Sequence, residues 1–361
     1  MTDLSIHAPD PSQRLWRRLR SEYFASPLGS ILTLVCVAIL GLLIWWVLDW
    51  TLFRATFEAD ARAAECRANG GACWAVIANR WRLIMFGIYP YDEQWRSALA
   101  CVIVIATVVL SCLPRMWGII RLAAIWLFAA LAFYILMKGG ALGLSRVSEE
   151  QWGGLALTLF LFVSTVVIGM PLAVMLALMR RSEMPVIARV TGLFIDAIRS
   201  LPLLAILFTF AVVLPFVLPA MLTGEKLYRV IVGLAIFFAA YQAEIIRGGL
   251  QGTASGQEEA AKALGIPYRY RISRIVLPQA FRLALPATIN QIVITFMETS
   301  LVVVVGFVEL LAAGNAAYNT GEWKFAYVEV YVFISAIYFT FVFGLSRYGA
   351  YLERRMNVGR R

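Results

Sequence analysis

The chain has 361 residues, of which 61% are hydrophobic and 13% aromatic, and its formal net charge is +10. A soluble domain is only about half apolar, so the composition excludes an ordinary soluble enzyme and indicates several membrane spans. The single histidine, His7, argues against histidine-based catalysis and histidine-ligated metal sites. The basic excess favours arginines that flank membrane spans over nucleic-acid binding.

Eight apolar runs have the length of a membrane helix, which needs about 20 apolar residues. No strand-like alternation competes with them, so we predict an all-α membrane protein. No cleavable signal peptide is expected, because the first run is too long for one. The expected spans are residues 29–52, 97–113, 119–137, 153–179, 199–218, 228–247, 283–305 and 326–351.

Basic residues gather on one side of these spans. They precede the first run, separate the second from the third, occur at 180–199 and throughout 247–282, and return in the tail. The positive-inside rule therefore places these segments and both termini in the cytoplasm. The basic, amphipathic segment 12–21 is expected to lie on the inner membrane surface.

One predicted outside loop is long and covers residues 53–96. Cys66 and Cys73 in this loop flank an Asn-Gly-Gly turn signal. In an oxidising compartment the two close a small disulfide loop; the alternative is two free thiols. The other cysteines lie within spans and are interpreted as small apolar residues. The chain has no CxxC pair, so no metal site is predicted.

The chain is expected to have three parts. Residues 1–28 form a basic cytoplasmic segment, and residues 29–150 form a three-span extension that contains the 53–96 loop. Residues 151–361 form a five-span domain, whose longest cytoplasmic loop is 248–282. The motifs that point to function lie in this third part.

The stretch 258–286 (EEAAKALGIPYRYRISRIVLPQAFRLALP) is polar and interrupted, although it lies between apolar runs. Ser255 and Glu258 have the spacing of a capping box. Gly265 is placed to end a short helix in the left-handed conformation, and Pro267 prevents its continuation. We therefore predict a helix of about two turns in a cytoplasmic loop.

One face of this predicted helix carries small and apolar residues. Ala260, Ala261 and Leu264 share that face, where two alanines allow close approach of a partner backbone. Glu259 and Lys262 surround it with charge. The pattern predicts a rigid knob that fits a groove on another protein.

The residues after the turn lead into the next span. Ile275 and Leu277 continue the apolar pattern, and Pro278 and Pro286 are expected to kink or break the helix. A kink there would pass movement of the knob on to the span.

The whole loop resembles the EAA loop of ABC importer permease subunits. The matching pattern is Glu259-Ala260-Ala261, three residues, Gly265, nine residues, Ile275, one residue and Leu277-Pro278. In that family the loop forms the coupling helix, which docks into the ATPase subunit. The alternative is an ordinary amphipathic loop helix.

Other stretches are similar to one branch of this family, the polar amino acid importers of the histidine, glutamate and arginine type. They are 158–178, 194–204, 240–250 and Thr299-Ser300-Leu301 with Glu309-Leu310. The resemblance covers about residues 153–355 and implies a type I permease core of five helices. The three leading spans resemble the extension of the larger permease subunit in general L-amino-acid importers.

The resemblance implies a multi-pass protein of the bacterial inner membrane that moves L-amino acids inward by alternating access. The implied partners are a second homologous permease subunit, two ABC ATPase subunits, a periplasmic amino acid-binding protein and membrane lipid. The chain has no GxxxxGK[ST] phosphate loop. We therefore expect no enzyme activity and no cofactor in this chain, with ATP and Mg bound by the ATPase subunits.

Glu298 is the clearest ionisable residue inside a predicted span, where a charge is costly unless it faces protein or water. Two roles are open: attraction of the substrate's ammonium group in the translocation cavity, or a structural hydrogen bond to another helix. Its neighbour Met297 departs from the family pattern, where many relatives carry lysine. The substrate contacts of those relatives are therefore not carried over to this position.

Further polar residues are candidates for the substrate path. Asn290, Gln291, Thr299 and Ser300 share the span of Glu298 and either line the path or hold helices together. Arg199, before the Leu201-Pro202 kink, either meets a carboxylate or marks the membrane interface.

Two other classes of protein are weighed against the permease. An ion-coupled secondary transporter would use membrane carboxylates such as Glu298 and Glu244 and need no ATPase. An integral membrane enzyme would gather His, Asp or Cys at an interface, and the sequence shows no such group. The matched cytoplasmic loop favours the permease.

Overall fold

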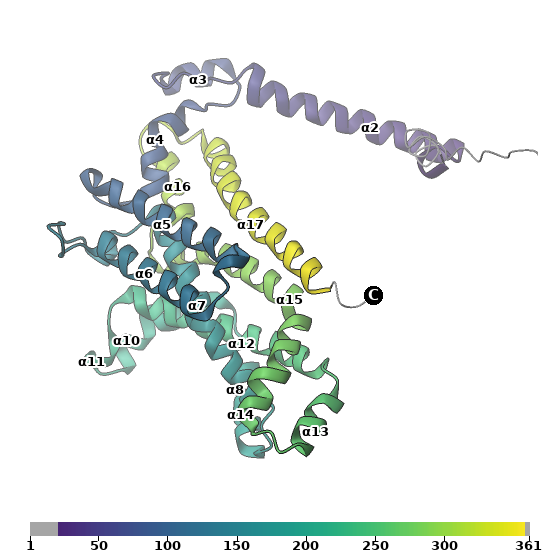
Figure 1. Cartoon of the computed structure of the whole chain (residues 1–361). Helices are drawn as coiled ribbons and strands as arrows, with labels where there is room; N and C mark the ends of the chain where they lie inside the picture. The colour runs from purple at the N-terminus through teal and green to yellow at the C-terminus, as the bar shows by residue number, and fades with distance from the viewer. Residues whose placement is uncertain (1–20, 358–361) are drawn as a thin grey trace, which may run out of the picture. The chain divides into compact units, whose positions relative to one another are not determined.

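The computed structural model describes residues 21–357; His7, most of the predicted amphipathic segment and the last arginines lie outside this range. Within it the chain is helical, with two isolated β-bridges and no strand (Figure 1). The predicted all-α class is confirmed. The chain divides into two compact units, with the boundary between Ala78 and Asn79. The three-part division at residues 28 and 150 stays a prediction.

The first unit begins with a long apolar helix. Helix α2 (Pro27–Leu48) starts at Ser26, whose side chain accepts the Gly29 N–H at 3.1 Å. It continues into the π-helical stretch η1 (Asp49–Phe53). None of the α2 residues is buried within the protein, which suits a helix covered by lipid.

A small disulfide-bonded loop follows α2. Helix α3 (Ala63–Asn69) ends at Gly70, whose φ of 64° is left-handed. A disulfide joins Cys66 to Cys73, and both cysteines are buried. Gly71 allows the chain to pass closely, since a Cβ there would lie 2.1 Å from the Arg54 carbonyl oxygen. Helix α4 (Ala75–Phe86) leads into the second unit.

The second unit contains the remaining long helices. Among the described residues of the chain, seven helices are long and apolar enough to cross a membrane, or up to eight if a bent pair is counted as one span. The long helices of this unit are α5 (Gln94–Cys112), α6 (Ile119–Lys138), α7 (Gly154–Arg180), α12 (Lys226–Gln251), α15 (Leu277–Glu298) and α17 (Tyr327–Asn357). Short elements join them: η2 (Tyr91–Glu93), η3 (Pro114–Met116), η4 (Glu149–Gln151), α11 (Ala220–Thr223), η7 (Thr299–Val305) and α16 (Leu310–Asn319).

The predicted span at 199–218 is the second limb of a bent pair. Helix α8 (Pro185–Ser200) meets the limb Leu203–Val217 at an angle of 102°. That limb consists of α9 (Leu203–Phe208), η5 (Thr209–Val213) and α10 (Leu214–Val217). Pro202 stands at the break, because proline has no N–H for the helix and restricts the residue before it.

The span predicted at 283–305 also differs at its start. In the structure a continuous membrane-length segment runs from Tyr268 to Val305. Pro286 lies inside α15, and Pro278 lies in its first turn, where proline is tolerated. The irregularity lies before them, in the π-helical stretch η6 (Arg271–Val276).

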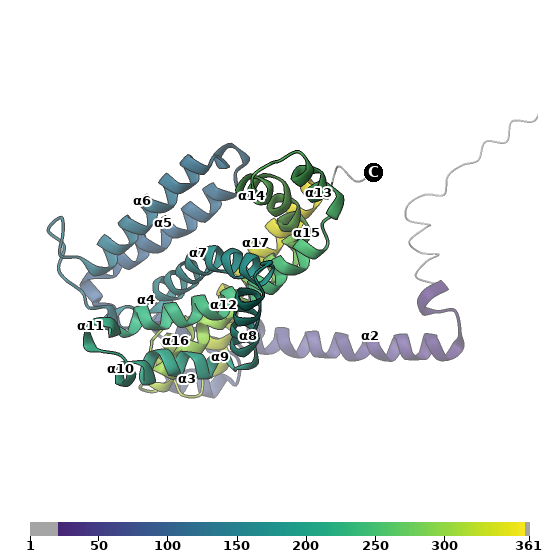
Figure 2. The ribbon, with the colours of Figure 1, turned by 90° about the horizontal axis from the view of Figure 1, so that it is seen from below.

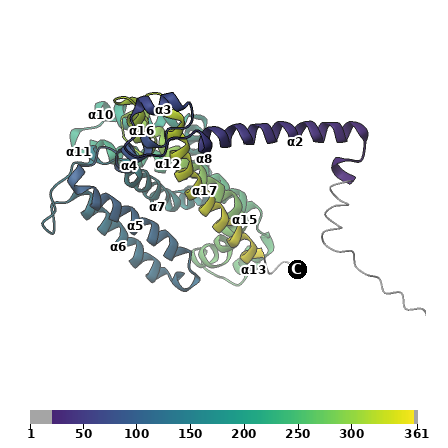
Figure 3. The same cartoon turned by 90° about the horizontal axis from the view of Figure 1, so that it is seen from above.

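Helix α12 is the centre of the second unit and packs against α7, α8 and α15 (Figure 2). Gly249 allows α12 and α15 to approach closely, because a Cβ there would lie 2.3 Å from the Ala280 carbonyl oxygen. Helix α17 lies beside α15 (Figure 3), and α5 pairs with α6. The five-span core and the α5–α6 pair are thus one packed body.

Polar side chains fasten the α5–α6 pair. Arg96 on α5 is fully buried, and its Nε donates to the Leu136 carbonyl oxygen at 2.6 Å. Lys138 at the end of α6 forms an ion pair of 2.5 Å with Glu149. Tyr228 on α12 donates to the same carboxylate at 3.2 Å. Glu149 therefore joins α6 to the central helix.

Candidate functional site

The predicted coupling loop forms the short helix α13 (Ser255–Ala263), which ends as the sequence predicts. Gly265 has a φ of 69°. Its N–H bonds to the Lys262 carbonyl, and the Ile266 N–H bonds to the Ala261 carbonyl, both at 3.0 Å. This pair of bonds is a Schellman motif. A Cβ on Gly265 would meet no atom within 4 Å, so glycine is needed for its backbone conformation.

The helix has an inner and an outer face, and they divide the predicted contact residues. Ala260 and Glu259 are exposed, and Leu264 has 79% of its surface exposed. Ala261, which the sequence placed on the same face, is only 3% exposed and packs inward. It stands one residue, or about 100°, from Ala260. The outer face is therefore Glu259, Ala260 and Leu264 with Gly265.

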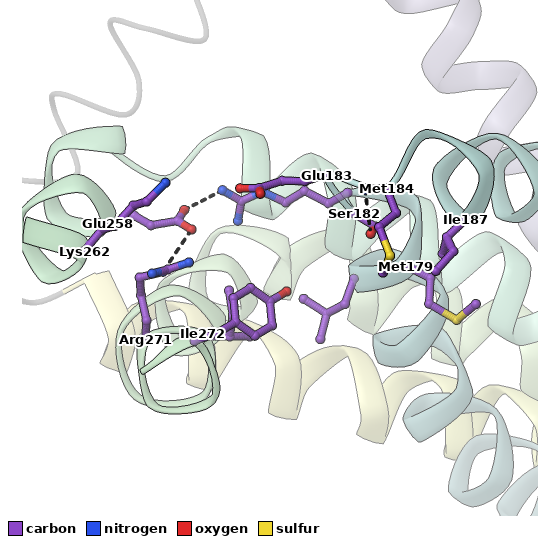
Figure 4. A pocket seen from close by; sticks show the side chains of 12 residues that line it. Met179, Ser182, Glu183, Met184, Ile187, Glu258, Lys262, Arg271 and Ile272 are labelled. Atoms are coloured by element: carbon purple, nitrogen blue, oxygen red, sulfur yellow. Dashed lines mark hydrogen bonds and ion pairs between the residues drawn. The ribbon is translucent and has the colours of Figure 1, made fainter. Parts of the chain in front are cut away.

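The start of α13 differs from the predicted capping box. The N-cap is Ala254, which has no side-chain oxygen and makes no capping bond. Glu258 instead forms ion pairs with Arg181, the residue after α7, and with Arg271 in η6. Together with Lys262 these residues line a cavity of about 610 Å³ (Figure 4).

The chain after α13 packs directly onto the membrane helices. Tyr268–Tyr270 form the single turn α14, and η6 and α15 follow. Ile272, Val276 and Ala280 are buried in one cluster with residues of α7, α8 and α12. Ile275 and Leu277 are half-buried and Pro278 is exposed. The coupling loop and the helical core are therefore continuous in packing as well as in sequence.

An ionic cluster joins α7, α8 and α12. Arg180 binds Asp196 in bidentate fashion at 2.9 and 3.1 Å and also pairs with Glu244 at 2.9 Å. Arg247 donates to the same Glu244 carboxylate at 2.9 Å. Arg199 approaches Glu244 at 3.8 Å. The Arg199 guanidinium therefore faces a carboxylate of its own chain, and its place on the substrate path stays a prediction.

Glu298 lies at the end of α15, where the helix tightens into the 3₁₀ stretch η7. It is half-buried, and among the described residues no hydrogen bond or ion pair is assigned to its carboxylate. Its neighbour Met297 is exposed. A carboxylate without a protein partner inside a membrane segment is available to a ligand or to water.

The other residues predicted to line the substrate path differ in burial and in hydrogen bonding. Gln291 and Thr299 are buried, and the Thr299 hydroxyl donates to the Phe296 carbonyl oxygen at 2.7 Å. Ser300 donates to the Met297 carbonyl oxygen at 2.8 Å. Asn290 is exposed. Asn290 and Glu298 are therefore the members of this set whose polar groups remain open.

Glu309 is a buried carboxylate whose structural role the sequence did not predict. It caps α16 by accepting the N–H groups of Leu311 and Ala312, both at 2.9 Å. Tyr338 donates to it at 3.2 Å. Burial raises the pKa of the Glu309 carboxyl to about 7, although these hydrogen bonds oppose the shift. The signal available in the sequence was a carboxylate directly before an apolar helical run, where a side-chain oxygen can accept the first N–H groups of the helix.

Residues 169–358 match the family described as "binding-protein-dependent transport system inner membrane component". This region contains α13, the ionic cluster and Glu298. The match therefore spans every element of the candidate site.

Whole-chain comparisons agree with the family match. The inner membrane amino-acid ABC transporter permease protein YhdY of Escherichia coli K12 is 37% identical over 99% of this chain and 98% of its own length. The glutamate/glutamine/aspartate/asparagine transport system permease protein BztC of Rhodobacter capsulatus is 32% identical over 94% of this chain and 93% of its own.

Among solved structures, the chain is similar to an amino acid ABC transporter crystallised with histidines. The two are 32% identical over 56% of this chain and 92% of that one, with a TM-score of 0.49. The family match and the whole-length relatives decide the identity: the chain belongs to the family of inner membrane components of binding-protein-dependent transport systems.

Proposed function

We propose that the chain is the permease subunit of an ATP-driven importer that carries amino acids across the bacterial inner membrane. The observation that carries this proposal is α13, a short helix with an exposed outer face that packs through η6 onto three membrane helices. The relatives named above are amino-acid ABC transporter permeases. They offer no support for the ion-coupled alternative.

ATP hydrolysis belongs to separate subunits. The chain has no GxxxxGK[ST] loop to hold phosphates, and its relatives are permease subunits. We propose that two ABC ATPase subunits bind ATP and Mg, and that one of them receives the outer face of α13 in a groove. A second homologous permease subunit completes the pore, and a periplasmic binding protein delivers the amino acid.

The mechanism that fits this arrangement is alternating access. Closure of the ATPase dimer moves α13, and the continuous segment from α14 to α15 passes the motion to the membrane helices. The pathway then opens outward to accept the amino acid, and ATP hydrolysis resets it. A ligand can drive such a change only by binding the two states with different affinity.

Glu298 is the best candidate for a substrate contact within the chain. A half-buried carboxylate with no described protein partner attracts the ammonium group that every amino acid carries. Asn290, two turns earlier on α15, offers an amide donor and acceptor to the same ligand. The Thr299 and Ser300 hydroxyls, by contrast, are engaged within their own helix turn.

The orientation follows from charge. We propose that both termini and α13 face the cytoplasm, because arginines concentrate in these segments. The Cys66–Cys73 loop then lies on the periplasmic side, where disulfides persist.

A cysteine cross-linking experiment tests the docking surface. Leu264→Cys places a thiol on the outer face of α13, and Met221→Cys, at a residue 95% exposed on the opposite membrane side, is the control. In the affinity-purified complex we expect a bifunctional thiol reagent to link Leu264→Cys, and not Met221→Cys, to a protein with the GxxxxGK[ST] motif. Absence of that link in an intact complex would overturn the assignment.

A further inference from the structure

Glu258 lies on the inner side of α13, away from the outer face that is proposed to dock into the ATPase. Only 24% of its side chain is exposed, and it bridges Arg181 and Arg271 (Figure 4). Arg271 belongs to the same loop. Arg181 lies 77 residues earlier, at the C-terminal end of α7. The bridge therefore connects α13 to α7, a membrane helix that does not adjoin the coupling loop in the sequence.

Arg271, one partner of Glu258, depends on this ion pair for its counter-charge. The Arg271 side chain is only 13% exposed, and its Nε has no hydrogen bond, although Glu258 lies 3.5 Å away. Loss of the carboxylate would leave a largely buried guanidinium without its counter-charge, which is costly. By contrast, Gln257 accepts a hydrogen bond at 2.8 Å from Gln279, which lies on α15, the helix into which the loop leads.

The end of α7 also forms ion pairs with two other helices. Arg180, beside Arg181, holds Asp196 on α8 and Glu244 on α12. Arg199 joins the same Glu244 at 3.8 Å and stands two residues before the 102° bend at Leu201-Pro202. Two sets of ion pairs, joined by the backbone between Arg180 and Arg181, thus connect α13 with the end of α7 and the end of α7 with the bent pair.

We propose that Glu258 is a positioning residue that fastens the coupling helix to α7 through Arg181, so that the two move as one unit. Motion of α13 then reaches the α8–α9 bend through the Arg180 ion pairs. This inference rests on the proposed function. It adds a second route beside the direct one through η6 and α15. It also gives the outer and inner faces of α13 separate roles, docking and transmission.

Glu258→Gln separates transmission from docking. In the complete importer reconstituted in vesicles, we expect ATP hydrolysis and the Leu264→Cys cross-link to persist. The amount of amino acid imported per ATP hydrolysed should fall by about fivefold, the scale expected for a partly exposed ion pair. Glu183→Gln is the matched control, because Glu183 lines the same cavity but has no ion pair assigned among the described residues. It should leave this ratio unchanged.

A covalent link tests whether the two elements move together. In the double variant Glu258→Cys/Arg181→Cys, a short thiol cross-linker should readily join the two cysteines. The link should restore the amount of amino acid imported per ATP hydrolysed. Transport blocked by the link, or a link that fails to form, would show that the elements separate or never meet. An unchanged ratio in Glu258→Gln would also reject the proposal, whereas wild-type vesicles without ATP-driven uptake would reject the proposed function itself.

Discussion

Gly265 shows how one residue shapes the docking loop. Its φ of 69° costs other L-residues about 1–2 kcal/mol, with asparagine the most tolerant. No neighbouring atom restricts a side chain there. We expect Gly265→Val to fray the end of α13 and reduce uptake several-fold, and Gly265→Asn to stay near the wild-type level. Equal uptake by the two variants would mean that the turn does not matter.

Glu298 is predicted to contact substrate. Glu298→Gln removes the negative charge but keeps the shape, so uptake should fall by about tenfold or more, the effect of losing about 1.4 kcal/mol. Ser300→Ala is the control, because that hydroxyl bonds only within its own helix turn in the described structure. Concentration-dependent uptake of labelled amino acids measures the effect. Full transport with an unchanged substrate range would assign Glu298 a purely structural role.

Glu309 makes stability depend on pH. Its folded-state pKa of about 7 lies above the ordinary 4.5, so the folded protein binds this proton more tightly than the unfolded chain. The stabilisation is complete below pH 4.5 and is lost as pH rises through about 7. Between pH 5 and about 8 the thermal midpoint of wild type should fall relative to that of Glu309→Gln. Parallel curves would contradict this account.

At this scale the sequence predicted the end of α13 but not its beginning. The left-handed glycine leaves a local signature, and Gly265 behaved as expected. Glu258 satisfied a local capping pattern, yet its partner Arg181 is 77 residues away. No local pattern reveals such a contact, because it depends on how α7 packs beside the loop.

Among the elements, most spans were predictable because a 20-residue apolar run has few alternatives in a membrane. Helix α8 was missed because Arg189 and Thr191 interrupt its apolar pattern. Leu201-Pro202 signalled a break, but not its angle. At the observed angle of 102°, α8 packs against α7 and α12, which lie elsewhere in the sequence.

The attachment of α5 and α6 to the core depends on Glu149. Burial alone would raise the pKa of this carboxyl, but Lys138 and the hydrogen bonds to it outweigh burial and lower the pKa below its usual value. Glu149→Gln should destabilise the purified protein by roughly 1 kcal/mol at neutral pH. The difference should shrink as the pH falls below about 4.5 and vanish below the lowered pKa of the folded-state carboxyl, because protonation then removes the same ion pair.

The exposed neighbour Glu150 supplies the control for this measurement. Glu150→Gln should leave the thermal midpoint of the purified protein unchanged across the same pH range. A similar loss in both variants would indicate a general effect of surface charge instead of an α6–α12 link.

For the whole molecule, composition predicted the helical membrane class, and the coupling loop indicated the permease family. The orientation derived from charge stays a prediction. Substrate identity was beyond reach, because the proposed binding protein selects it. The orientation of the chain in the membrane can be tested. A membrane-impermeant thiol reagent applied to intact cells should label Cys66 and Cys73 only after reduction. Labelling without reduction would contradict a closed periplasmic disulfide loop.

The central claim is that a separate ATPase drives transport through this chain. The most direct measurement is uptake of a labelled amino acid into vesicles that contain the purified importer with its binding protein. We predict accumulation only with ATP on the α13 side, and its loss in Leu264→Asp. Accumulation driven by a proton or sodium gradient without ATP would contradict the claim.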